Sequence, residues 1–334
     1  MSRMLFVLSV SLGSVLFGYL LRRWWTGATA MEGAGPPRLA RSETTRNRLE
    51  SVSAKLKIAA IFVLNPVPII NSFWALPLEE RGLLVMPILG IISLSVAGGS
   101  AIVMNRLLRI PPKRAASVFT SGMFTNILAF GGLIAFVLFG HIGYAIVQLY
   151  NMFIDFGYYV VGFPVSRRLS LGAGKRAEIS FSLIREQPFL FIPVAAIVAG
   201  LFLNVFGIDR PRLLHEASSV LIPTISAMLG TAIGLTLYIG RIARYTKEIA
   251  LVSAIKFVIV PSIMIPLAAA IGLTGVMGGL PFNVVVIVSF MPVAFTALVP
   301  PAIYGFDLDL ANSAWIVTTL ALAAIVPALF AVLG

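Results

Sequence analysis

Ten apolar runs, each long enough to cross a membrane as a helix, constrain what this chain can fold into. They span residues 3–22, 57–77, 82–104, 116–140, 143–163, 187–207, 214–239, 249–272, 283–304 and 312–333. A helix needs about 20 residues to cross a hydrocarbon core of roughly 30 Å. Only 11% of the residues are charged, whereas soluble domains carry about 25%. We therefore predict an all-α integral membrane protein with ten transmembrane helices.

The basic residues lie mainly in every second loop between these runs. Twenty Lys and Arg residues fall in the loops after runs 1, 3, 5 and 7, and only four fall in the opposite segments. Cytoplasmic loops carry the excess of positive charge in membrane proteins. We therefore expect a multi-pass protein of the cell (inner) membrane with both termini on the non-cytoplasmic side. This topology explains the net charge of +12 without a nucleic-acid partner.

Prolines and glycines interrupt the runs at matching places in the two halves. Gly131 and Gly132 interrupt run 4, and Pro292, Pro300 and Pro301 interrupt run 9. Five runs per half force the second half to enter the membrane in the opposite orientation. We predict two inverted five-helix repeats, residues 1–163 and 187–334, joined by a cytoplasmic connector at 164–186. Helices 4 and 9 are expected to be broken and to cross.

The breaks indicate a binding site. Proline lacks an N–H and clashes with the carbonyl one turn back, so Pro292 must kink or break its helix. Free backbone groups at membrane depth are tolerated only beside protein or a water-filled cavity, and carriers build substrate sites from such segments. Asn126 and Gly131 in run 4, and Pro292 and Thr296 in run 9, are the predicted substrate contacts. The alternatives are a helix–helix hydrogen bond for Asn126 and a kink without a ligand for Pro292.

Polar side chains in three other runs extend the predicted site. Asn151 and Asp155 lie on one stripe of run 5, and Asn65 lies in run 2. A carboxylate at membrane depth is costly, so by default it is functional or paired. Asp155 could carry a proton, help to ligate sodium, or form a structural pair with Lys256 in run 8. We assign Asp155 and Lys256 to ion coupling or charge balance.

The absence of cysteine and of known catalytic motifs excludes several classes of function, and one long loop has two interpretations. The chain has no cysteine, so disulfides are excluded. It has no phosphate-binding GxxxxGK loop, HExxH motif or nucleophile elbow, so we expect no enzyme activity, no cofactor and no metal site. The long loop from Gly27 to Ala54 ends in a basic stretch. That stretch could lie as a helix on the anionic cytoplasmic leaflet, or serve as a solvated connector.

Local motifs carry a resemblance to a known family. Run 9 and the segment after it read MPVAFTALVPPAIYGFDLDLANSAWIVTT, and run 4 contains FTNILAFGG, in which Gly131 follows Asn126 by five residues. IFVLNPVPIINSF, AIVQLYNMFID and SAIKFVIVP in runs 2, 5 and 8 fit the same pattern. Over essentially all ten runs the chain resembles the auxin efflux carrier family, which belongs to a superfamily with the bile acid sodium symporters. Leu133 and Thr296 depart from the family pattern, where a proline and often an asparagine stand.

The resemblance implies a scaffold and a transport domain that move past each other like an elevator, with a homodimer suggested by relatives. We expect a secondary transporter of small organic anions such as mono- or dicarboxylates, with sodium or proton coupling left open. One alternative is a sodium-coupled symporter of a larger amphipathic solute. Another is a non-transporting membrane sensor on the same scaffold. Because Leu133 and Thr296 depart from the family pattern, we do not assign the known substrate of any relative to this chain.

Overall fold

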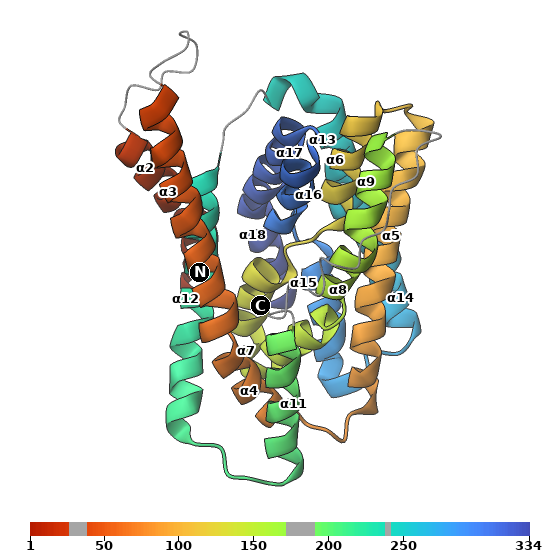
Figure 1. The fold of residues 1–334 in the computed structure, drawn as a ribbon. Coiled ribbons are helices and arrows are strands. Elements are labelled where there is room, and N and C mark those ends of the chain that lie inside the picture. Colours follow the sequence, from red (N-terminus) through yellow and green to blue (C-terminus); the bar gives the residue numbers. More distant parts are fainter. Residues whose placement is uncertain (27–38, 172–190, 238–241) are drawn as a thin grey trace.

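A computed structural model describes residues 1–26, 39–171, 191–237 and 242–334, and this part of the chain is all-helical (Figure 1). The first half contains α1 (Ser2–Leu8), α2 (Ser14–Thr26), α3 (Leu39–Ile58), α4 (Pro66–Trp74), α5 (Met86–Leu107), α6 (Pro112–Met123), α7 (Leu133–Asn151), α8 (Ile154–Gly157) and α9 (Phe163–Leu171). The second half contains α11 (Phe191–Val205), α12 (Arg212–Thr236), α13 (Thr246–Ala254), α14 (Val260–Ala270), α15 (Leu280–Ser289), α16 (Val299–Tyr304), α17 (Leu308–Leu320) and α18 (Leu322–Leu333).

Seven helices of the described chain are long and apolar enough to cross a membrane, which confirms an all-α protein of the membrane-spanning type. They are Ser2–Thr26, Asn47–Trp74, Gly82–Leu107, Ile127–Leu171, Arg212–Thr236, Ile242–Ala270 and Leu308–Leu333. Three shorter apolar helices are Phe191–Val205, Val276–Ser289 and Phe295–Tyr304. The first residues of the predicted run 187–207 lie outside the described ranges. Most of the predicted connector 164–186 also lies outside them.

Local irregularities explain why these helices differ from the ten apolar runs. Short π-helical turns join α1 to α2, α3 to α4, α8 to α9 and α13 to α14, so each pair continues as one rod. Gly140 has a non-helical backbone (φ 67°, ψ −155°) inside α7. Positive φ is readily adopted only by glycine, so Gly140 divides the 45-residue apolar helix near the end of predicted run 4.

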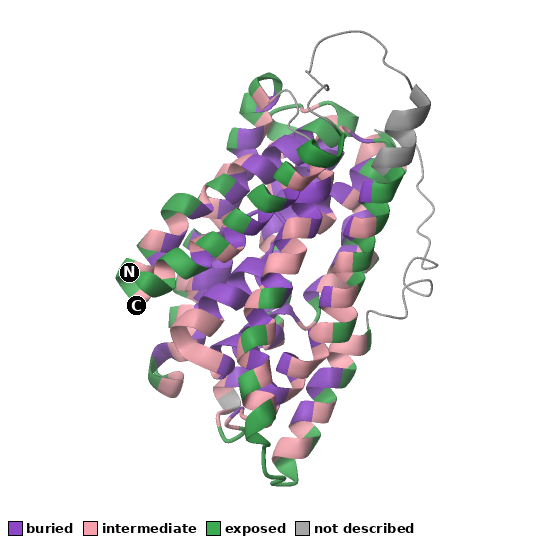
Figure 2. Ribbon diagram, turned by 90° about the vertical axis from the view of Figure 1, so that its left-hand side faces the viewer, coloured by how far each residue is buried: buried purple, intermediate pink, exposed green. Residues whose placement is uncertain are grey.

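The helices form two bundles. In the α12 bundle, α12 packs against α2, α3 and α4, and α11 packs against α4. In the crossing bundle, α6 packs against α5, α9, α13 and α17, and α15 packs against α7 and α14. Figure 1 shows α2, α3 and α12 on the left and α5, α6, α9 and α14 on the right. Buried residues concentrate where the helices pack together (Figure 2), and the two termini lie side by side, where α1 contacts α18.

Close contact within the α12 bundle depends on small residues. A Cβ at Gly234 would overlap the carbonyl of Val15, and a Cβ at Gly18 would overlap the carbonyl of Thr231. Small residues let membrane helices approach backbone to backbone. Within lipid no hydrophobic force drives helices together, so this close van der Waals packing stabilises their association. The contact between α2 and α12 is therefore a close backbone packing that tolerates no larger residue at Gly18 or Gly234.

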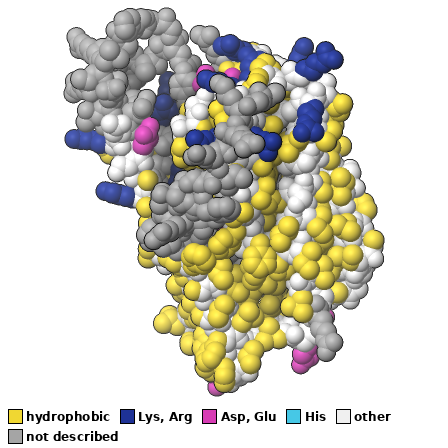
Figure 3. Space-filling model, turned by 45° about the vertical axis from the view of Figure 1, so that its right-hand side comes forward, with side chains coloured by type: hydrophobic (Ala, Val, Ile, Leu, Met, Phe, Trp, Pro, Cys, Tyr) yellow, Lys and Arg dark blue, Asp and Glu magenta, His cyan; other side chains and the backbone are white. Residues whose placement is uncertain are grey.

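Basic side chains gather at one end of the molecule. Figure 1 places the end of α2, the start of α6, the end of α9 and the start of α13 at the same end. On the face shown in Figure 3, the Lys and Arg side chains lie at this basic end, above a broad apolar belt. The second part of the predicted long loop is helical, because α3 begins at Leu39 and continues through a π-helical turn to α4. Residues 27–38 of that loop lie outside the described residues.

Candidate functional site

Two helix interruptions meet at the centre of the crossing bundle, in a region we call the crossing (residues 124–126 and 290–294). After α6 the chain becomes extended at Phe124, and before the turn at Phe295 it is extended at Ala294. An isolated antiparallel bridge joins Thr125 to Val293. The Asn126 N–H donates to the Pro292 carbonyl over 2.9 Å, and the Ala294 N–H donates to the Phe124 carbonyl over 2.9 Å. Each break therefore satisfies backbone groups of the other.

The side chains of Tyr158 and Thr318 satisfy further polar groups of the crossing. The Tyr158 hydroxyl accepts from the Thr125 N–H over 2.9 Å and donates to the Thr125 carbonyl over 3.2 Å. Its ring stacks on Phe124 at a centroid distance of 4.1 Å. The Thr318 hydroxyl accepts from the Val293 N–H over 3.2 Å. Buried backbone groups need such partners, since an unpaired one costs about as much as a lost hydrogen bond.

Lys256 places a buried amine directly at the crossing. Its side chain is 1% exposed, and its Nζ donates to the Phe124 carbonyl over 2.9 Å and to the Thr125 hydroxyl over 2.6 Å. Phe124 caps the C-terminus of α6, where the helix dipole favours positive charge. Among the described residues, no ion pair joins Lys256 to Asp155. The structural pair considered from the sequence is therefore not formed in this conformation.

A cavity of about 170 Å³ lies between the two bundles beside the crossing. Most of its polar groups come from the crossing bundle and from Asn65, and the wall formed by α12 is mostly apolar. The residues that line it are Lys57, Ile61, Asn65, Thr125, Asn126, Ile127, Leu128, Ala129, Tyr144, Asn151, Asp155, Tyr158, Ile222, Ile225, Ser226, Leu229, Ile233, Ala294, Phe295 and Thr296. We call it the central cavity.

Unpartnered polar groups line the central cavity. The Thr296 hydroxyl is buried without a hydrogen-bond partner. The Asn126 side-chain amide, 8% exposed, has no partner among the described residues. Buried polar groups are nearly always hydrogen-bonded, so two neighbouring exceptions indicate groups available to a ligand.

Two pairs complete the polar wall. Tyr144 donates its hydroxyl proton to the Asn65 carbonyl oxygen, and Asn151 Nδ2 donates to Asp155 Oδ2 over 3.1 Å. The pairs fix the orientation of both amides, while the second Asp155 oxygen is left for the cavity.

The chain turns into helix immediately after each break. Helical turns begin at Ile127 and Phe295, and neither N-terminus has a side-chain cap. The first residues of both turns line the central cavity. Helix N-termini carry partial positive charge and free N–H groups. The polar wall can therefore meet an anionic group from two directions.

The structure brings together five of the eight residues predicted from the sequence. Asn65, Asn126, Asn151, Asp155 and Thr296 all line the central cavity. The other three lie outside its lining. Gly131 is buried where a Cβ would meet the Met291 side chain at 3.2 Å, so it permits close packing. Pro292 contributes its carbonyl to the crossing, and Lys256 supports the crossing from outside the cavity.

Sequence reasoning missed Lys57, Thr125, Tyr144 and Tyr158. A signal existed for Tyr158, because it follows Asp155 by three residues and continues the polar stripe of run 5. Lys57 was counted as a cytoplasmic loop charge at the start of run 2. Tyr144 gave no signal, since tyrosine near a span end is typical of the membrane interface.

Neither a scan of the chain against protein-family models nor a search of curated proteins gives a match. The family resemblance noted above therefore stays an expectation from the sequence.

We predict that Tyr158→Phe destabilises the protein by about 1–3 kcal/mol, because the partly buried N–H and carbonyl of Thr125 lose their shared partner while the ring stack remains. Thermal unfolding of the purified protein measures the change. Tyr159→Phe is the matched control, since the Tyr159 hydroxyl has no hydrogen bond among the described residues. Equal unfolding temperatures for both variants would contradict the role of Tyr158.

Proposed function

We propose that this protein is a secondary transporter of small organic anions that works by elevator-like alternating access. The observation that carries the proposal is the pairing of two broken helices beside a cavity that lies between two bundles. Carriers place their substrates at discontinuous helices of this kind, near mid-membrane. A cavity at a bundle interface can open to either side when one bundle moves past the other.

The proposed architecture is ten membrane segments in two inverted five-helix repeats. Division of the long apolar helix at Gly140 turns the seven spans into eight, and Phe191–Val205 adds a ninth. The tenth consists of the two short helices Val276–Ser289 and Phe295–Tyr304, one on each side of the break. The two breaks then fall in segments 4 and 9, which hold equivalent positions in the repeats. The α12 bundle would be the scaffold and the crossing bundle the moving unit. The basic end would face the cytoplasm, as the positive-inside rule requires.

The size and charge of the central cavity favour a small anion. Its volume of about 170 Å³ lies below the roughly 300–1,000 Å³ of pockets for drug-sized ligands. That volume suits a mono- or dicarboxylate better than a bile-acid-sized solute. Two helix N-termini, the Lys57 side chain and the free Asn126 and Thr296 groups can all donate to a carboxylate.

The position of Lys256 bears on coupling. Sodium sites at broken helices use freed carbonyl oxygens and hydroxyls as ligands. Here the Phe124 carbonyl and the Thr125 hydroxyl already accept hydrogen bonds from Lys256. We therefore propose that Lys256 supplies fixed positive charge at the crossing. Asp155, the carboxylate in the central cavity, is assigned to proton coupling.

We expect Asn126→Ala to lower uptake of the substrate into proteoliposomes by at least about tenfold, a loss of about 1.4 kcal/mol of interaction. The amide has no structural partner, so thermal unfolding should stay unchanged. Asn283→Ala, in α15 and outside the central cavity, is the control for loss of an amide. Uptake equal to that of the unaltered protein would reject Asn126 as a substrate ligand.

Asp155→Asn separates coupling from binding. We expect the variant to exchange substrate across the membrane but to lose accumulation driven by a pH gradient, because an amide cannot carry the proton. Uptake with and without an imposed gradient measures this difference. Asp209→Asn, an exposed carboxylate outside the cavity, is the control. Gradient-driven accumulation that survives in Asp155→Asn would overturn the coupling role.

A thermal-shift screen of the purified protein against formate, acetate, succinate and cholate tests the substrate class. We expect stabilisation by one of the small carboxylates, since a ligand that binds only the folded state raises its stability by mass action. The shift should be the same in sodium and potassium salts. Stabilisation that requires sodium, or that only cholate produces, would favour the symporter of larger solutes. Binding without uptake would favour a sensor.

A further inference from the structure

A second cavity adjoins the central cavity on the side of the basic end. It has a volume of about 420 Å³ and is lined by residues of α3, α12, α16 and α17, among them Ser53, Thr236, Ile303 and Asn312. We call it the vestibule. Lys57 and Phe295 line both cavities, so these two side chains form the partition between them.

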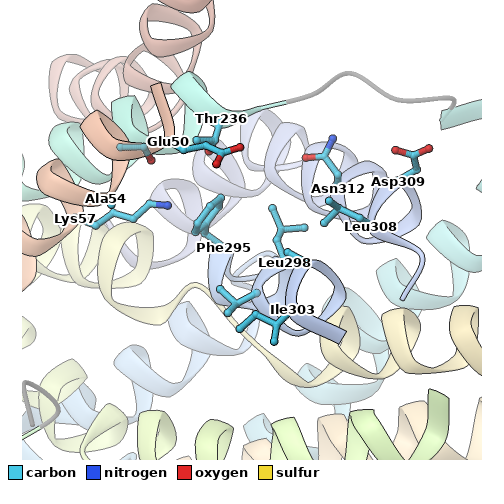
Figure 4. Close-up of a pocket in the computed structure, with 13 residues that line it drawn as sticks. Glu50, Ala54, Lys57, Thr236, Phe295, Leu298, Ile303, Leu308, Asp309 and Asn312 are labelled. Atoms are coloured by element: carbon cyan, nitrogen blue, oxygen red, sulfur yellow. The ribbon is translucent and has the colours of Figure 1, made fainter. Parts of the chain in front are cut away.

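The two partition residues contact each other. The Lys57 Nζ lies 3.3 Å from the centroid of the Phe295 ring, and Figure 4 shows the amine directed at the ring. Among the described residues, Lys57 makes no ion pair and no hydrogen bond. Within the described ranges its amine makes a cation–π contact alone, and such a contact is weaker than contact with a carboxylate at short range in a region poor in water.

The partition residues come from opposite sides of the bundle interface. Lys57 belongs to α3, which packs in the α12 bundle, and Phe295 begins the helical turn after the crossing. A shift of one bundle past the other would separate them. The contact between Lys57 and Phe295 is thus placed where alternating access requires a barrier.

The vestibule also holds two carboxylates. Glu50 and Asp309 line the vestibule as well. In Figure 4 the carboxylate of Asp309 lies at the far side from Lys57, and Glu50 lies beside Thr236. Glu50 interacts with another group, and Asp309 lies in the first turn of α17, where the helix dipole stabilises a negative charge. Lys57 is the cation at the inner end of the vestibule.

We propose that Lys57 and Phe295 form an anion-selective gate between the vestibule and the central cavity. An organic carboxylate in the vestibule replaces the Phe295 ring as the partner of the Lys57 ammonium, and the partition opens as the ring is released. The gate rests on the proposed transport function and specifies the path by which the substrate class reaches the central cavity from the basic end.

The absence of cysteine from the sequence allows a direct test by single-cysteine labelling. Ser226→Cys places a small reporter in the central cavity, and Ala302→Cys places a matched reporter in the exposed wall of the vestibule. The purified full chain in nanodiscs is treated with two methanethiosulfonate reagents of similar size, one with an anionic sulfonate and one with a trimethylammonium group. The measured quantity is the labelling rate for each reagent.

We expect Phe295→Ala to speed labelling of the Ser226→Cys reporter by both reagents and to leave the Ala302→Cys reporter unchanged. Lys57→Met should lower the ratio of anionic to cationic labelling at the Ser226→Cys reporter by about tenfold, because a charge in a low-dielectric passage concentrates counter-ions. Lys57→Arg should keep the ratio. Lys55→Met, which removes an exposed charge two residues away, should also keep it.

Unchanged labelling of the Ser226→Cys reporter in Phe295→Ala would overturn the partition, and equal effects of Lys55→Met and Lys57→Met would overturn the selectivity. If Phe295→Ala fails to fold, Phe295→Leu, which removes the ring and keeps apolar bulk, replaces it with the same expectation. Labelling requires no transport. A failed gate therefore leaves the carrier proposal standing, whereas the carrier proposal fails through the uptake measurements.

Discussion

The structure depends on how two broken helices satisfy their backbone groups without water. A helix that stops inside hydrocarbon exposes N–H and carbonyl groups that lipid cannot pair. Here the two breaks pair with each other through the bridge from Thr125 to Val293. Tyr158, Lys256 and Thr318 provide the remaining partners. Neither break would be stable alone, so both segments and their supporting side chains must form one unit.

This mutual pairing also bears on the proposed binding of an anion. The carbonyl-rich C-terminus of α6 faces Lys256, so the negative end of that half-helix is already neutralised. The turns that begin at Ile127 and Phe295 have their N-termini at the wall of the central cavity. The partial positive charges of the two helix N-termini therefore face the cavity, whereas the negative C-terminus of α6 does not. This difference favours the proposed anion over a metal ion as the ligand. Asp155 is the exception, which is why we assign it to a proton.

Much of the site could be predicted from sequence because membrane depth makes polar and helix-breaking residues conspicuous. Asn126, Asp155 and Thr296 are polar residues in apolar surroundings, and Pro292 predicted the break in its helix. The rest depended on three-dimensional placement. Lys57 resembled a loop charge, and only the fold shows that it contacts Phe295 and borders two cavities. Lys256 invited pairing with Asp155 by charge alone, whereas the fold gives it the Phe124 carbonyl and the Thr125 hydroxyl. The number of spans and the inverted repeats stay predictions.

The unequal walls of the central cavity connect binding with movement. Most polar groups of the cavity belong to the crossing bundle or to Asn65 and Lys57 beside it. Apart from Ser226, α12 presents apolar side chains, namely Ile222, Ile225, Leu229 and Ile233. An apolar wall makes no directional contacts, so sliding along it breaks few hydrogen bonds. In the proposed mechanism, the crossing bundle would carry a bound anion along α12 with its hydrogen bonds intact. The directional contacts that cross the interface, such as the one between Tyr144 and Asn65, are then the ones that would have to break in the proposed transport.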